Sequence, residues 1–167
     1  LAEVRRLFGA SRDIRQLLVL HLLYDTGLRV RELVRLRVSD FDKHHQTITI
    51  HNSKGQKTRT VNYGLELRQT LCTYCKVLGY VPKNTLIESI KEPGQPLSKR
   101  GVQHIVKEAV RRSGLKKRIH PHTLRHTFAV HFLNFGESLF HLQQLLGHEH
   151  LTTTLHYLKY AKIPPQK

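Results

Sequence analysis

Apolar residues recur at the spacing of an α-helix along most of the chain. Residues 14–24 carry such a stripe, and Thr26 and Gly27 directly after it predict the end of that helix. Ser98 predicts the N-cap of a later helix, and Gly114 predicts its end. The same period predicts the other helices, which cover residues 29–37, 65–78, 123–134 and 139–146, and a last short helix that carries Tyr157.

Two short segments alternate instead with the period of a β-strand. Residues 47–51 and 58–63 are rich in β-branched side chains. Residues 52–57 between them contain Gly55, which suits the tight connection of a hairpin. Residues 79–96 hold Gly, Pro and Asn and are predicted to form a loop. The expected fold class is therefore α+β and mainly α, with one small antiparallel sheet in a single domain that spans residues 1–167.

Charge and composition narrow the class of protein. The 167 residues include 28 Lys and Arg against 12 Asp and Glu, which gives a formal net charge of +16. With 39% hydrophobic residues and two cysteines, neither a disordered chain nor a disulfide framework is expected. No apolar run is long enough for a membrane span. Eight basic residues lie in residues 28–60 and nine in residues 96–126, so the charge favours a binding face for nucleic acid over a uniform coat.

The helix that begins after Ser98 is the best candidate for the face that binds DNA. Its apolar residues form one stripe, and its opposite side is basic. A solvated helix face would show the same pattern. The residues expected to contact DNA from this helix are Lys99, Arg100, His104 and Lys107.

Two other groups of residues invite a chemical interpretation. The chain has 13 histidines, but the spacing of His148 and His150 does not match a zinc signature, so we expect no metal. Cys72 and Cys75 have the spacing of a redox pair, but they lie within a predicted amphipathic helix. We therefore interpret these cysteines as buried small hydrophobic residues.

A set of side chains suited to phosphoryl transfer without a metal is spread along the chain. His122 and Arg125 are three residues apart, so they project from the same face near a helix start. Guanidinium groups can bind the oxygens of a phosphodiester, a tyrosine hydroxyl can attack it, and histidine and lysine can move the protons. The candidate set is Arg29, Lys54, His122, Arg125, His148 and Tyr157.

Four segments resemble the signature boxes of the tyrosine recombinases, the family of phage integrases and Xer recombinases. They occur in the family's order and cover nearly the whole chain. The segments are Thr26-Gly-Leu-Arg-Val-Arg-Glu-Leu33, His120-Pro-His-Thr-Leu-Arg125, Leu145-Leu-Gly-His148 and Thr152-Thr-Thr-Leu-His-Tyr157.

The resemblance implies a role for each member of the set. Arg29 and Arg125 would hold the scissile phosphate, and His148 would hydrogen-bond to it. His122 would act as an acid or base near the nucleophile. Lys54 would protonate the leaving 5′ oxygen, with Lys57 as the competing lysine, and Lys57 and Arg59 are further expected DNA contacts.

Tyr157 would be the nucleophile and would form a 3′-phosphotyrosyl link to the cut strand, so that rejoining needs neither ATP nor a cofactor. Tyr160 is the rival nucleophile. The remaining tyrosines are expected to be structural.

The resemblance also implies partners and a setting. Double-stranded DNA would be the substrate, and the full-length protein would act in a tetrameric synaptic complex in the cytoplasm of a bacterium, without a membrane partner. Complete recombinases have an N-terminal core-binding domain, which we expect to lie outside residues 1–167. Two alternatives share much of this pattern: a DNA-relaxing enzyme similar to the type IB topoisomerases, and a catalytically inactive DNA-binding module.

Overall fold

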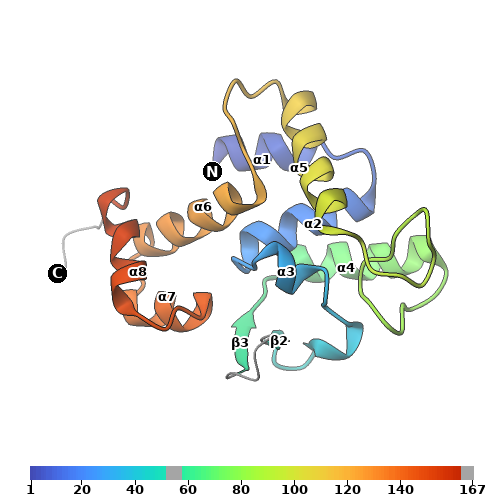
Figure 1. The fold of residues 1–167 in the computed structure, drawn as a ribbon, viewed down its shortest axis with the longest axis horizontal. Helices are drawn as coiled ribbons and strands as arrows, with labels where there is room; N and C mark the ends of the chain where they lie inside the picture. Colours follow the sequence, from blue (N-terminus) through green and yellow to red (C-terminus); the bar gives the residue numbers. More distant parts are fainter. Residues whose placement is uncertain (52–57, 163–167) are drawn as a thin grey trace.

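The computed structural model describes residues 1–51 and 58–162 (Figure 1). Single 3₁₀ turns lie at Val38–Asp40 and His156–Lys159. The strands are β1 (Phe41–Asp42), β2 (Thr47–Ile50) and β3 (Arg59–Asn62). The helices are α1 (Ala2–Gly9), α2 (Ile14–Asp25), α3 (Val30–Leu33), α4 (Leu65–Leu78), α5 (Lys99–Ser113), α6 (Pro121–Asn134), α7 (Leu139–Leu146) and α8 (Leu151–Leu155).

Helix α2 is the centre of the main hydrophobic core. Asp13 caps its start by accepting a hydrogen bond from the Gln16 backbone N–H at 2.8 Å, and Thr26 ends it as predicted. Every residue from Leu18 to Leu23 is buried, because α4, α5 and α6 all pack against this helix. The predicted single stripe thus understates its burial: α2 is covered on all sides.

The predicted antiparallel hairpin is confirmed in its two strands. β2 pairs with β3, with Ile48 opposite Val61, and β1 adds a third, unpredicted strand on the other edge of β2. Ile48 and Val61 are buried and join the main core. The predicted connection, with Lys54, Gly55 and Lys57, lies outside the described residues.

Three sequence expectations need correction. The helix expected over residues 29–37 ends at Leu33, because the next residues make 3₁₀-type hydrogen bonds and the Leu36 carbonyl turns to accept from the Leu86 N–H. Helix α1, which packs against α5, was not predicted from the sequence. Cys72 is exposed and Cys75 is only half-buried, so the two cysteines are not buried core residues.

A second, smaller apolar cluster lies between α6, α7 and the C-terminal turns, at the left of Figure 1. Its buried members are Ala129, Leu133, Leu142, Leu146 and Tyr157. Tyr157 lies in the 3₁₀ turn His156–Lys159, directly after α8. Within the described residues, none of the helices has the length and apolar character needed to cross a bilayer.

Candidate active site

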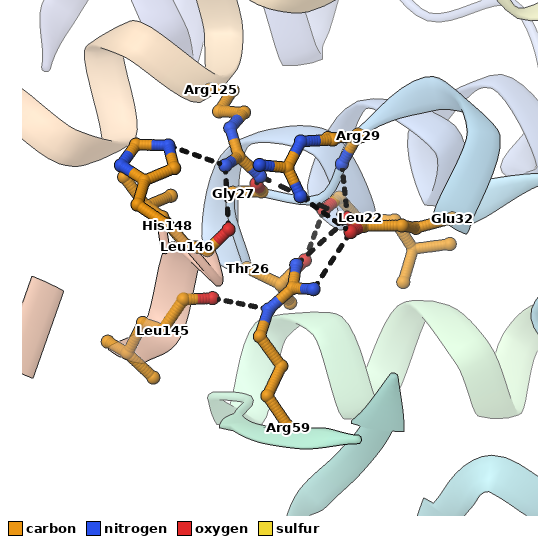
Figure 2. A network of polar contacts seen from close by, with 10 residues as sticks. All are labelled: Leu22, Thr26, Gly27, Arg29, Glu32, Arg59, Arg125, Leu145, Leu146 and His148. Atoms are coloured by element: carbon orange, nitrogen blue, oxygen red, sulfur yellow. Dashed lines mark hydrogen bonds and ion pairs between the residues drawn. The ribbon is translucent and has the colours of Figure 1, made fainter. Parts of the chain in front are cut away.

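Arg125 is a buried arginine near the start of α6, with only 2% of its surface exposed. Its guanidinium donates to the Gly27 carbonyl at 2.5 Å and to the Leu146 carbonyl at 2.8 Å, and its Nη2 lies 3.1 Å from His148 Nε2 (Figure 2). These partners come from two segments far apart in the sequence, the turn after α2 and the end of α7. The side chain is therefore held in one orientation before any ligand binds.

The local sequence explains how α6 delivers this side chain. Pro121 occupies the first position of the helix, where its missing N–H costs no hydrogen bond. Gly27 adopts φ +61°, and a Cβ at this position would lie 2.6 Å from the Phe128 ring. Glycine thus permits the close approach that brings the Gly27 carbonyl to Arg125. Burial, together with the neighbouring charge of Arg29, lowers the pKa of Arg125 to about 10, so the group is charged at neutral pH.

Glu32 is the acidic centre of the site. Its carboxylate accepts two hydrogen bonds from Arg59, both at 2.8 Å, and one from Arg29 Nη1 at 3.1 Å, and Arg125 Nη1 lies 4.0 Å away (Figure 2). It also accepts from the Arg29 backbone N–H at 2.7 Å, which caps the start of α3. Burial alone would raise the pKa of Glu32, but the hydrogen bonds and charge of Arg59 and Arg29 outweigh it and hold the pKa below its usual value.

Sequence reasoning missed Glu32. The sequence offered one signal: Glu32 is an acidic residue in a strongly basic segment, three residues after Arg29, the first residue of a predicted helix. That pattern indicates a helix cap. It does not show that the carboxylate is buried among three arginines.

Arg59 is placed differently from the expectation that it contacts DNA. Its side chain is only 8% exposed, and its Nε donates to the Leu145 carbonyl at 2.7 Å in addition to the two bonds to Glu32. The guanidinium of Arg59 thus points into the molecule. In place of the expected contact with DNA, it binds Glu32 and the Leu145 carbonyl. Arg29 is the opposite case: its side chain is 42% exposed and remains accessible from solvent.

His148 follows the C-terminal end of α7 and joins Arg125 to the C-terminal turns. Since Arg125 can only donate, His148 Nε2 accepts, and the ring proton lies on Nδ1, which contacts Thr154 Oγ1 at 3.0 Å. Burial and the charges of Arg125 and Arg29 lower the pKa of His148 to about 4. The ring is therefore neutral over the physiological range.

Tyr157 lies against His148. The two rings are stacked with centroids 6.2 Å apart and an interplanar angle of 9°, and the His126 ring is 5.1 Å away on another side. Tyr157 is 6% exposed, whereas Tyr160 is 55% exposed and contacts His126 and His156. The structure thus brings Tyr157, and not Tyr160, beside the Arg125 and His148 pair.

A basic groove of about 940 Å³ runs beside this cluster, between α5 and the segment that leads into α6. His122 is exposed and lines it, as do His104 and Lys107 among the expected DNA contacts. Lys99 and Arg100 are exposed at the start of α5 but do not line the groove. Other basic residues of its lining were not among the expected DNA contacts: Arg111, Lys117, Arg118 and His120.

Two of the expected site residues cannot be placed in this geometry. Lys54 and Lys57 lie outside the described residues, beyond the ends of β2 and β3. Among the residues that the structure does describe, no group of three or more His, Cys, Asp or Glu side chains is arranged to hold a metal ion.

The comparisons with known proteins identify the family of the chain. The model of the phage integrase family matches residues 1–162, so the chain belongs to that family. It is 39% identical over 150 residues to the tyrosine recombinase XerC of Staphylococcus aureus, an alignment that covers 88% of this chain and 49% of the relative. The chain thus spans about half the length of the curated relatives it matches.

Solved structures show the same fold. The crystal structure of XerA recombinase aligns with a TM-score of 0.86 and 31% identity, over 93% of this chain and 57% of that one. The Tn1549 transposon integrase in complex with circular intermediate DNA aligns with a TM-score of 0.69 and 26% identity, over 85% of this chain and 52% of that one. The expected α+β, mainly helical fold is confirmed.

Proposed function

We propose that this chain is the catalytic domain of a site-specific DNA recombinase that cuts and rejoins double-stranded DNA through a covalent link to Tyr157. The observation that carries the proposal is the convergence of three side chains from separate segments: Arg125 contacts His148, and His148 stacks on Tyr157. Family membership and the DNA complex of the Tn1549 relative support the choice of substrate.

In this proposal Arg29 and Arg125 bind the non-bridging oxygens of the scissile phosphate. Attack by a tyrosine oxygen adds negative charge to the phosphoryl group, and fixed guanidinium donors stabilise that charge without reorganising. Arg125 is already oriented by its carbonyl partners, while the half-exposed Arg29 can turn to the ligand. His148 Nε2 accepts from Arg125 in this structure, so hydrogen bonding of His148 to the phosphate requires the ring proton to move to Nε2 when DNA binds.

The covalent step balances without a co-reactant. The Tyr157 oxygen forms a bond to phosphorus, the bond from phosphorus to the 5′ oxygen breaks, and the product is a 3′-phosphotyrosyl strand with a free 5′ hydroxyl. We assign His122 to accept the tyrosine proton and Lys54 to protonate the leaving oxygen. Attack by a 5′ hydroxyl on the phosphotyrosine reverses the step and rejoins a strand.

The groove along α5 binds the duplex beside the reacting phosphate. Its lining combines cationic side chains with the exposed His122, the residue that we assign to accept the tyrosine proton. Phosphate contacts of this kind position the DNA without reading its sequence. We further propose that the full-length protein acts as one protomer of a tetrameric complex in the bacterial cytoplasm.

The test is covalent capture of DNA. The chain is incubated with a random-sequence duplex pool, the captured sites are sequenced, and one of them is rebuilt with a nick a few nucleotides beyond the cut so that the short 5′-hydroxyl fragment is lost. We expect a protein–DNA adduct that survives denaturation. It should disappear in Tyr157→Phe and persist in the matched control Tyr160→Phe. DNA binding by the wild-type chain without any adduct would overturn the proposal and leave an inactive DNA-binding module.

A further inference from the structure

The strand β3 carries an arginine whose side chain ties together three segments of the site. Arg59 pairs with Ile50 across the sheet, and its side chain leaves the sheet toward α3 and the end of α7 (Figure 2). Only 8% of the side chain is exposed, so it is not available to the surface. An arginine this buried is stable only where its donors are satisfied.

Three N–H groups of Arg59 are satisfied by two different segments. Nη1 and Nη2 bind the two oxygens of Glu32 in a fork, each at 2.8 Å, and Nε donates to the Leu145 carbonyl at 2.7 Å. A lysine cannot reproduce this pattern, because it carries a single nitrogen and not a planar fork.

The turn after α7 is shaped to admit this guanidinium. Gly147 has φ +61°, and a Cβ there would lie 3.2 Å from Arg59 Cδ and Nη1. A side chain at residue 147 would therefore press on Arg59. The glycine lets the turn that leads to His148 pass close to the arginine.

Both partners of Arg59 act on groups at the reaction centre. Glu32 also binds Arg29 and lies 4.0 Å from Arg125. Leu145 precedes Leu146, whose carbonyl holds Arg125, and His148 follows two residues later. A shift of Arg59 would be passed to Arg29 through Glu32, and to Arg125 and His148 through the end of α7.

We propose that Arg59 is a positioning residue, which holds Glu32 and the end of α7 so that Arg29, Arg125 and His148 keep the geometry needed to bind the transition state. The inference rests on the proposed recombinase function. Arg59 touches neither DNA nor the reacting atoms in this account. Its effect belongs to the rate of the covalent step and not to the affinity for DNA.

The test separates rate from affinity. Arg59→Ala and Arg59→Lys are compared with Arg68→Met, an exposed arginine on α4. The probe is the nicked duplex rebuilt from a captured site, with the chain in excess, and affinity is measured by gel shift on the same duplex. We expect the single-turnover rate of adduct formation to fall by about 10- to 100-fold in Arg59→Ala, the range that a displacement of about 1 Å can produce, with affinity unchanged. Arg68→Met should keep the wild-type rate.

Two further measurements keep the result interpretable. Methylguanidinium added to Arg59→Ala should restore part of the rate in a saturable manner, because it supplies the missing fork. Arg59→Lys keeps the positive charge and is used in case the alanine variant does not fold. Its thermal unfolding is measured together with its single-turnover rate of adduct formation. We expect it to fold and to remain slow.

The outcomes distinguish the two proposals. An Arg59→Lys variant that cleaves at the wild-type rate, or a loss of affinity that accounts for the whole loss of adduct, would overturn the positioning role. A wild-type chain that forms no adduct would instead overturn the proposed function.

Discussion

The chain's positive charge occurs in two environments that differ in burial and in the partners of the charged groups. In the buried cluster, Arg125 and Arg59 are enclosed, and their N–H groups donate hydrogen bonds to backbone carbonyls and to Glu32. In the groove along α5, Lys107 and Arg111 are exposed, and Arg111 pairs with Glu108 only at the surface. The formal charge of each arginine is the same. Its surroundings decide its role. A buried arginine is held rigidly enough to stabilise a transition state, whereas an exposed one can change conformation to bind the phosphates of DNA.

The difference also separates what each region contributes to folding. Breaking a buried charged contact leaves an uncompensated charge in a poorly solvated place, which is costly. Exposed ion pairs are screened by water and salt and contribute little. We therefore expect substitutions in the buried cluster to affect both stability and cleavage, and substitutions in the groove to affect mainly DNA affinity.

The largest effect is expected for Arg125→Ala. It removes the donors to the Gly27 and Leu146 carbonyls and takes away a proposed phosphate ligand. The rate of adduct formation should fall by about 10²- to 10³-fold, the cost of losing a preorganised donor. The free energy of unfolding, measured by urea titration, should fall by about 3–5 kcal/mol, because two buried carbonyls each lose their donor. Near-wild-type stability would show that the buried cluster is not the rigid region we describe.

Glu32→Gln should have the next largest effect on stability. The substitution keeps the shape but removes the negative charge that faces Arg29, Arg59 and Arg125. We expect a loss of about 2–3 kcal/mol in the free energy of unfolding. The matched control is Glu108→Gln, which removes a carboxylate on α5 that pairs with the exposed Arg111, and it should change stability far less. Equal effects would erase the contrast between the two regions.

The pH dependence of stability should report on His148. Its folded pKa, about 4, lies below its ordinary value of 6.5, so between these values the unfolded chain binds more protons than the folded chain. Its contribution to stability is fully present above pH 6.5 and is lost as the pH falls toward 4. We expect the loss to be about 1–3 kcal/mol over this window. In His148→Asn that part of the pH dependence should vanish; a difference between the two proteins that is constant with pH would contradict the account.

The smallest effects are expected in the groove. Lys107→Ala should leave folding unchanged and weaken DNA binding about equally for all sequences. Its clearest signature is the salt dependence, because each lost phosphate contact reduces the slope of log affinity against log salt by about 0.9. Lys76→Ala, an exposed lysine on α4 away from the groove lining, is the control. An unchanged slope for Lys107→Ala would remove this residue from the DNA-binding face.

The comparison also explains what could be predicted from the sequence. Most of the helices, though not α1, and the strand pair follow from local periodicity and from caps such as Ser98, whose side chain accepts from the Gly101 N–H as expected. The grouping of Arg125, His148 and Tyr157 was predicted from the recombinase resemblance. These features depend on short-range patterns or on motifs whose order is informative.

The internal ion network could not be predicted in this way. Arg59 and Glu32 are 27 residues apart, and Arg59 and Leu145 are 86 apart, so no local pattern connects them. In the sequence, Arg59 looks like any basic residue next to a basic hairpin. Only the packing of β3 against α3 and α7 shows that its guanidinium is directed inward. The exposure of Cys72 was missed for a related reason, since a helical position indicates a face but not what covers it.

The central claim is that Tyr157, held beside Arg125 and His148, forms the bond to DNA, and the adduct itself can report which tyrosine reacted. Trypsin cuts after Lys and Arg, so residues 126–159 form one peptide with Tyr157 as its only tyrosine, while Tyr160 falls in residues 160–162. After nuclease and trypsin digestion of the trapped adduct, mass spectrometry should find the nucleotide remnant on the peptide 126–159. A remnant on the peptide 160–162, or on no tyrosine peptide, would contradict the account.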